Sequence, residues 1–229
     1  MKGELRDVGM LSDIVPKFRY NLKSILQVIF LFLGYEILLI SIFKLIALYF
    51  TCRHKDFDVF LKYWHLILWP VVLIFIITGS RLWKIRVLEK FGNVTLKKLV
   101  LTFTVTYIFQ FFIYLFCVSD EFSWKNISID FNQALTFNVI SSLIFAPVLE
   151  ELLFRGIIQE YLCRKNSFIL SVVLASLLFS VHHLTFSQFV TAFLGGLYFG
   201  VLYYKTQSLT YSMVAHSFYN LLCFYMRFG

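Results

Sequence analysis

The stretch APVLEELLFRG, residues 146–156, places two adjacent carboxylates, Glu150 and Glu151, and the guanidinium of Arg155 inside an apolar run of about residues 135–161. A run of this length and composition predicts a helix that crosses a membrane. An ionisable side chain at the centre of such a helix costs at least about 2.5 kcal/mol on insertion scales. These three groups therefore need partners or a watery cavity, and they are the first candidates for a functional site.

The whole chain has the composition of a polytopic membrane protein. Of its 229 residues, 59% are hydrophobic and 15% are charged, whereas ordinary soluble domains carry about 25% charged residues. The 28 Phe and 13 Tyr suit lipid-facing surfaces and interfacial aromatic belts. We predict an all-α transmembrane helix bundle of about seven spans, with six to eight as the range. The predicted spans are residues 24–50, 63–79, 99–118, 135–161, 167–185, 188–204 and 208–226.

The net charge of +8 is explained by membrane topology and not by nucleic-acid binding. Lys and Arg gather before the first span, between the second and third, and after the fourth and sixth, which predicts a cytoplasmic N-terminus. A small Phe-rich chain with this bias is typical of a bacterial cell membrane. The four Cys form no CxxC pair, so neither a zinc knuckle nor a disulfide framework is indicated.

Ionisable groups in the spans fall into pairs at helical spacing. Glu151 and Arg155 stand at i, i+4, where side chains of a helix meet, so they are expected to form an ion pair. Glu150 is offset from Glu151 by about 100° around the helix and lacks that partner. Glu36 and Lys44, eight residues apart in the first span, share a face, and we interpret them as satisfied between helices or snorkelling.

Two later spans carry polar residues at the same spacing. Phe179 and His183 share one helix face, whereas His182 points away and is interpreted as a helix-end residue. His216 and Asn220 form a polar stripe on an otherwise apolar helix. A lone intramembrane His is more often structural, but this set lies on three successive helices. Its members are able to converge on one water molecule.

Such a set suits hydrolysis. A carboxylate beside an imidazole deprotonates water and returns the proton to a leaving amine, and a His–Asn pair offers N–H donors to an oxyanion. No Ser or Cys stands out as a nucleophile with a base beside it, and the HExxH motif of zinc proteases is absent. Glu150 with two His would still match the His₂Glu zinc set, so metal dependence stays open.

These motifs resemble those of a known family. EExxxR at Glu150, Glu151 and Arg155, FxxxH at Phe179 and His183, and HxxxN at His216 and Asn220 resemble the three motifs of the CPBP/Abi family. This family comprises CAAX proteases and bacteriocin-processing enzymes related to the type II CAAX prenyl endopeptidase. The resemblance covers about residues 135–225, whereas residues 1–134 match only as membrane spans. We expect one integrated membrane domain, with N-terminal spans and basic segments in 1–134 and a catalytic helix core in 135–229.

The resemblance implies an intramembrane endopeptidase whose site lies in a cavity among the helices. Glu150 would be the general base on water, helped by His183. His216 and Asn220 would form the oxyanion hole. The supporting residues would be Glu151, Arg155 and Phe179, and the GxxxG glycines Gly196 and Gly200 would allow close helix packing.

The cofactor prediction is none, with zinc as the alternative. No further ligand is evident, and Asn220 is a poor zinc ligand, so a metal-free glutamate protease is preferred. If zinc is bound, its ligands would be Glu150, His183 and His216.

The depth of these residues in the membrane is a test of the hypothesis. With straight helices, Glu150 and His183 would lie deep or toward the outer side, while His216 would lie about 12 Å from the inner end of its helix. Helix tilt, or a break at Pro147, would be needed to bring them together. Residues that stayed apart would contradict a shared catalytic site.

The predicted function is therefore hydrolysis of a peptide bond in a membrane-associated peptide or protein tail, within the lipid bilayer. The alternative is a bacteriocin self-immunity protein, or a membrane regulator of a sensor kinase, that acts by binding. Family members are associated with such roles. A proton- or ion-coupled transporter using Glu36, Lys44 and Glu150 is a third hypothesis. The sequence does not indicate whether a substrate would be prenylated.

Overall fold

The computed structural model describes residues 20–53, 65–117, 139–183 and 185–228. A helix occupies each of the seven predicted spans in this part of the chain, so the all-α prediction is confirmed. Most of the basic segment before the first span lies outside the described residues. The elements are α2 (Leu22–Cys52), α4 (His65–Leu82), η1 (Val87–Lys90), α5 (Leu96–Cys117), η3 (Ser141–Phe145), α7 (Ala146–Glu151), η4 (Leu152–Gln159), α8 (Glu160–Lys165), α9 (Phe168–Ser180), α10 (Phe186–Thr206) and α11 (Leu209–Phe228).

The outer surface of the bundle is apolar, as a surface in contact with lipid must be. Large apolar side chains such as Phe30 on α2 and Leu101 on α5 are 71% and 61% exposed. Three helices within the described ranges are long and apolar enough to cross a membrane: Leu22–Cys52, Leu96–Leu115 and Phe186–Thr206. The protein is therefore a helical membrane bundle.

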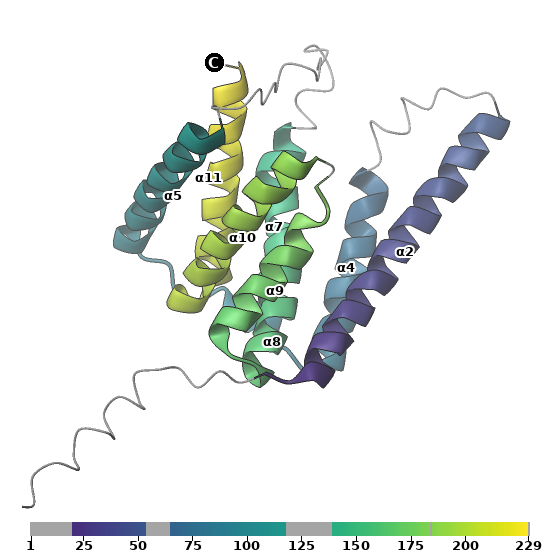
Figure 1. Ribbon diagram of the computed structural model, residues 1–229, viewed down its shortest axis with the longest axis horizontal. Helices are drawn as coiled ribbons and strands as arrows, with labels where there is room; N and C mark the ends of the chain where they lie inside the picture. The colour runs from purple at the N-terminus through teal and green to yellow at the C-terminus, as the bar shows by residue number, and fades with distance from the viewer. Residues whose placement is uncertain (1–19, 54–64, 118–138, 184, 229) are drawn as a thin grey trace, which may run out of the picture.

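The helix formed by η3, α7, η4 and α8 runs through the centre of the bundle (Figure 1). On one side α9 packs against α10, and α11 packs against α5, α7 and α10. On the other side α2 and α4 cover the central helix (Figure 1). One apolar core joins these parts, and it includes Val28, Phe32, Tyr35, Val72, Ile76, Leu149, Leu153, Phe154, Ile157 and Phe179.

The helices are staggered along the bundle axis, and this stagger decides which residues meet. Leu209, the first residue of α11, lies against Gly156 of the central helix, whose added Cβ would be 3.3 Å from Leu209 Cδ1. Gly156 precedes Lys165, the last residue of α8, by nine positions, or about 13 Å at the helical rise. Counting from this shared level, Glu150 lies six residues along the central helix and His216 seven along α11. The stagger therefore brings the two residues to the same depth.

The central helix does not break at Pro147. The helix is continuous there, and the irregularities are two π-helical segments, η3 before α7 and η4 after it. Proline clashes with the carbonyl four residues earlier in a regular α-helix, and a wider π turn relieves that clash. The break considered from the sequence is thus replaced by a π turn, and the depth difference is removed by stagger.

Candidate active site

The predicted ion pair of Glu151 with Arg155 is present and fully buried. Arg155 Nη1 lies 3.0 Å from Glu151 Oε1, and the two side chains are 1% and 0% exposed. Arg155 Nη2 donates to the Gly196 carbonyl at 3.0 Å, so the guanidinium also ties the central helix to α10. The guanidinium carbon of Arg155, Cζ, lies 4.8 Å from the centre of the Phe179 ring, within the range of a cation–π contact. These contacts therefore fix Glu151, the neighbour of Glu150 in the chain, within the packing of the bundle.

His216 of α11 lies between the two adjacent glutamates. Its Nδ1 is 3.0 Å from Glu151 Oε1, and its Nε2 is 3.6 Å from Glu150 Oε2. Since an ionised carboxylate only accepts hydrogen bonds, we assign the Nδ1 proton to the contact with Glu151. This contact orients the ring and leaves Nε2 facing Glu150. Glu150 is thus the only one of the two carboxylates that remains available, with its side chain 38% exposed.

Two aromatic rings hold the His216 imidazole in place. The Phe199 ring stacks on it at 4.7 Å with an interplanar angle of 20°, and the Phe179 ring meets it edge-on at 5.6 Å. Sequence reasoning identified Phe179 but missed Phe199. Phe199 precedes Gly200 in the GxxxG helix, but in a chain with 28 Phe no local signal separates it from lipid-facing rings.

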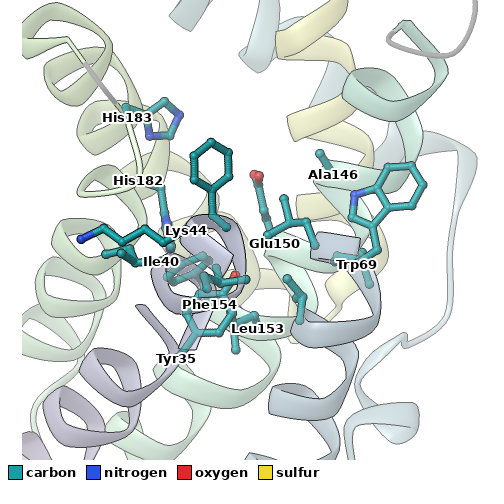
Figure 2. Close-up of a pocket in the computed structure, with 15 residues that line it drawn as sticks. Tyr35, Ile40, Lys44, Trp69, Ala146, Glu150, Leu153, Phe154, His182 and His183 are labelled. Atoms are coloured by element: carbon teal, nitrogen blue, oxygen red, sulfur yellow. The ribbon is translucent and has the colours of Figure 1, made fainter. Parts of the chain in front are cut away.

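Glu150 faces a cavity of about 550 Å³ between α2, α4, the central helix and the end of α9. Figure 2 shows the Glu150 carboxylate and the His183 imidazole at this cavity, and both residues line it. Most of the wall is apolar. The lining residues are Tyr35, Leu39, Ile40, Phe43, Lys44, Leu68, Trp69, Val72, Ala146, Leu149, Glu150, Leu153, Phe154, His182 and His183.

The two adjacent histidines of α9 have different partners. His182 Nδ1 lies 3.1 Å from Glu36 Oε1 of α2, which agrees with the interpretation of Glu36 as satisfied between helices and of His182 as a satisfied helix-end residue. The His183 ring meets the Phe179 ring at 5.5 Å, and its buried Nδ1 has no hydrogen-bond partner among the described residues. Both histidines line the cavity, and His183 is the one whose buried ring nitrogen is left without a protein partner in the described part of the chain.

Asn220 is placed differently from the other candidates. Its Nδ2 donates to the Ser142 carbonyl of η3 at 2.9 Å and not to either glutamate, although, like His216, it is not among the residues that line the cavity. The structure thus brings Glu150, Glu151, Arg155 and His216 into one contact network, with His183 on the same cavity as Glu150. Asn220 contacts the backbone of the central helix one turn and a half before Pro147.

The GxxxG glycines allow α10 to approach the central helix and α9. A Cβ on Gly196 would lie 3.1 Å from Ser176 Cα, and one on Gly200 would lie 2.8 Å from Gln159 Oε1. Gln159 Nε2 donates to the Gly200 carbonyl at 2.8 Å, repeating one turn later the contact of Arg155 with Gly196. Gln159 was missed from the sequence, although its i, i+4 spacing from Arg155 was a usable signal.

Replacing Gly200 by Ala is expected to destabilise the protein by about 1–3 kcal/mol, because the added methyl meets both Gln159 and Val172 at less than 3.0 Å. Unfolding of the detergent-purified protein measures this effect. Gly34→Ala is the matched control, since a Cβ at Gly34 has nothing within 4 Å. Equal destabilisation by the two substitutions would contradict close packing at Gly200.

The zinc alternative requires Glu150, His183 and His216 to lie together as ligands. Over the ranges that the structure describes, no group of three or more His, Cys, Asp or Glu side chains is placed to hold a metal ion. In particular, Glu150, His183 and His216 do not form such a group. His216 instead has its two ring nitrogens directed at the two glutamates.

Comparison with known proteins points to the same family as the motifs. The family model described as "Type II CAAX prenyl endopeptidase Rce1-like" matches residues 132–222, which contain all three motifs. The predicted resemblance is therefore confirmed over that range. The chain is also 28% identical over 114 residues to "Putative membrane peptidase YdiL" of Bacillus subtilis (strain 168).

That alignment covers 50% of this chain and 47% of the relative, so the chain spans about half of that protein's length. No solved structure shows a significant match. Together with the apolar helices, the family match shows an integral membrane protein similar to the CAAX-type membrane proteases.

Proposed function

We propose that this protein is an intramembrane endopeptidase that hydrolyses a peptide bond in a membrane-associated peptide or protein tail. The observation that carries the proposal is the distance of 3.6 Å between His216 Nε2 and Oε2 of Glu150, the carboxylate that lines an apolar cavity. The second carboxylate, Glu151, is occupied by Arg155 and by His216 Nδ1. One available carboxylate beside one oriented imidazole is the arrangement that general acid–base catalysis requires.

In the proposed reaction Glu150 takes a proton from a water molecule in the cavity as the water oxygen attacks the carbonyl carbon of the substrate. The resulting tetrahedral oxyanion is stabilised by the Nε2–H of a His216 ring that carries both protons, while its Nδ1–H stays on Glu151. Glu150 then delivers the proton to the leaving nitrogen, the C–N bond breaks, and a carboxylic acid and an amine are released. His183, on the same cavity, helps to hold the water. The resemblance gives Asn220 the role of a second oxyanion donor.

The lining of the cavity supports an apolar substrate. Leu39, Phe43, Leu68, Trp69 and Val72 of α2 and α4 line the cavity around Glu150, and such a surface favours apolar side chains or a lipid-modified tail. The low dielectric of the apolar wall also makes each charge near it more effective than in bulk solvent.

Substrate capture tests the proposal. The full chain carrying Glu150→Gln is expected to retain a bound polypeptide when purified in mild detergent, because binding survives and turnover does not. The captured polypeptide is identified by mass spectrometry and incubated with the wild-type protein in liposomes. Cleavage at one bond supports the proposal. A captured polypeptide that the wild-type protein leaves intact would indicate a binding function such as immunity or regulation.

Metal dependence gives an independent prediction. Because the mechanism uses Glu150 and His216 directly, hydrolysis is expected to be unchanged after treatment with 1,10-phenanthroline and dialysis. The measurement is the cleavage rate of the captured substrate before and after treatment, with a zinc metalloprotease as the positive control for chelation. Loss of hydrolysis that returns on addition of Zn²⁺ would overturn the metal-free mechanism.

A further inference from the structure

The π turn before Glu150 leaves the Ser142 carbonyl without its donor in the main chain. The Ala146 N–H donates to the Ser141 carbonyl, five residues earlier, as in a π-helix. In the same register the donor for the Ser142 carbonyl would be the N–H of residue 147. That residue is Pro147, which has no N–H. The Ser142 carbonyl therefore depends on a side chain or on solvent.

Asn220 supplies the missing donor. Its Nδ2 lies 2.9 Å from the Ser142 oxygen, and it comes from α11, which packs along η3 and α7. A carbonyl in a membrane-spanning helix is costly to leave unsatisfied, because no water reaches it from the lipid side. The hydrogen bond from Asn220 thus replaces the one that Pro147 cannot make.

The same face of α11 holds the central helix at a second point. His216 and Asn220 are four residues apart, and they contact Glu151 and Ser142, respectively. These two contacts flank Pro147 and the first turns of α7. If the hydrogen bond from Asn220 to the Ser142 carbonyl were lost, the Ala146 N–H could donate to the Ser142 carbonyl instead, in an ordinary α-helical bond. The π turn would then close, and η3 would rotate relative to α7 by about 100°, the angle of one residue.

We infer that Asn220 is a positioning residue for Glu150: its side-chain amide stands in for the N–H absent at Pro147 and so stabilises the π turn from which α7 presents Glu150 to the cavity. This role differs from the second oxyanion donor that the resemblance implies. It rests on the proposed function only in so far as Glu150 acts as the base. The hydrogen bond itself is independent of any reaction.

A double-mutant cycle of Asn220→Ala and Pro147→Ala separates the two roles. Asn220→Ala alone is expected to lower kcat by about 100-fold with KM little changed, since a displacement of about 1 Å in a catalytic group has an effect of that size. Pro147→Ala restores an N–H that can reach the Ser142 carbonyl. In the Pro147→Ala background, adding Asn220→Ala should therefore lower kcat far less. An oxyanion donor would instead give the same loss in both backgrounds, which would overturn the inference.

Thermal unfolding of the same four proteins in detergent provides a readout that needs no turnover. Asn220→Ala is expected to lower the Tm of the parent protein more than that of Pro147→Ala. Equal lowering in both backgrounds would overturn the inference, even where Pro147→Ala is itself inactive. The Tm effects of the two substitutions could be coupled in a parent protein that hydrolyses no substrate. That result would refute the proposed function but support the replacement of the Pro147 N–H by the Asn220 amide.

Discussion

Replacing Glu150 by Gln is expected to lower the rate of peptide hydrolysis by about 10³-fold, because the amide cannot accept the proton of the attacking water. The fold should be retained. Glu150 is 38% exposed and its contact with His216 Nε2 is the longer of the two at 3.6 Å, whereas the buried contacts of Glu151 are untouched. The measurement is kcat with the captured substrate in liposomes, together with the Tm of the variant.

The matched control for this change is Glu89→Gln. Glu89 is paired with Arg86 in an exposed contact of η1 at 2.8 Å, away from the cavity-lining residues. The same loss of one carboxylate should leave kcat unchanged there. A Glu150→Gln variant with the turnover of the wild-type protein would exclude Glu150 as the base.

Replacing Arg155 by Ala is expected to produce the largest loss of stability, about 3–5 kcal/mol, because it leaves a buried charge without its partner. Glu151 would keep only His216, and the Gly196 carbonyl would lose its donor. Hydrolysis should fall as well, since Glu151 also orients the His216 ring. Unfolding in mixed detergent–SDS micelles measures the change in the free energy of unfolding.

Arg86→Ala is the comparison for this second prediction. Its partner Glu89 is 57% exposed and Arg86 itself is 81% exposed, so loss of that ion pair should cost at most about 1 kcal/mol. If the two arginine variants were equally stable, the buried contacts of Glu151 would not contribute the stability expected of them.

The sequence was sufficient for the features that depend on local geometry. Apolar runs of about 20 residues predicted a helix at each of the seven spans, since lipid leaves the backbone no other partner than itself. The i, i+4 spacing predicted the contact of Glu151 with Arg155 and the shared face of Phe179 and His183, because 3.6 residues per turn places such residues side by side. The same geometry identified Glu150 as the carboxylate without a partner on its own helix.

Contacts between helices depend on the axial offset and packing of one helix against another, which the periodicity of a single helix does not specify. The distance of His216 from the two glutamates follows from the stagger of α11, which begins at the level of Gly156 and not at the end of α8. The contact of Glu36 with His182, and the cavity wall formed by α2 and α4, likewise depend on how separate helices pack.

The sequence by itself determined a helical membrane protein, predicted a hydrolytic set of side chains, and identified Glu150 as the carboxylate without a partner on its own helix. Only the tertiary structure decided that Glu151 orients the His216 ring and that Phe199 stacks on that ring. It also decided that Asn220 donates to the Ser142 carbonyl. The physical reason is that helical periodicity sets the direction of a side chain around its own axis. The axial offset of each helix is set by packing, such as the close approach that Gly156, Gly196 and Gly200 allow.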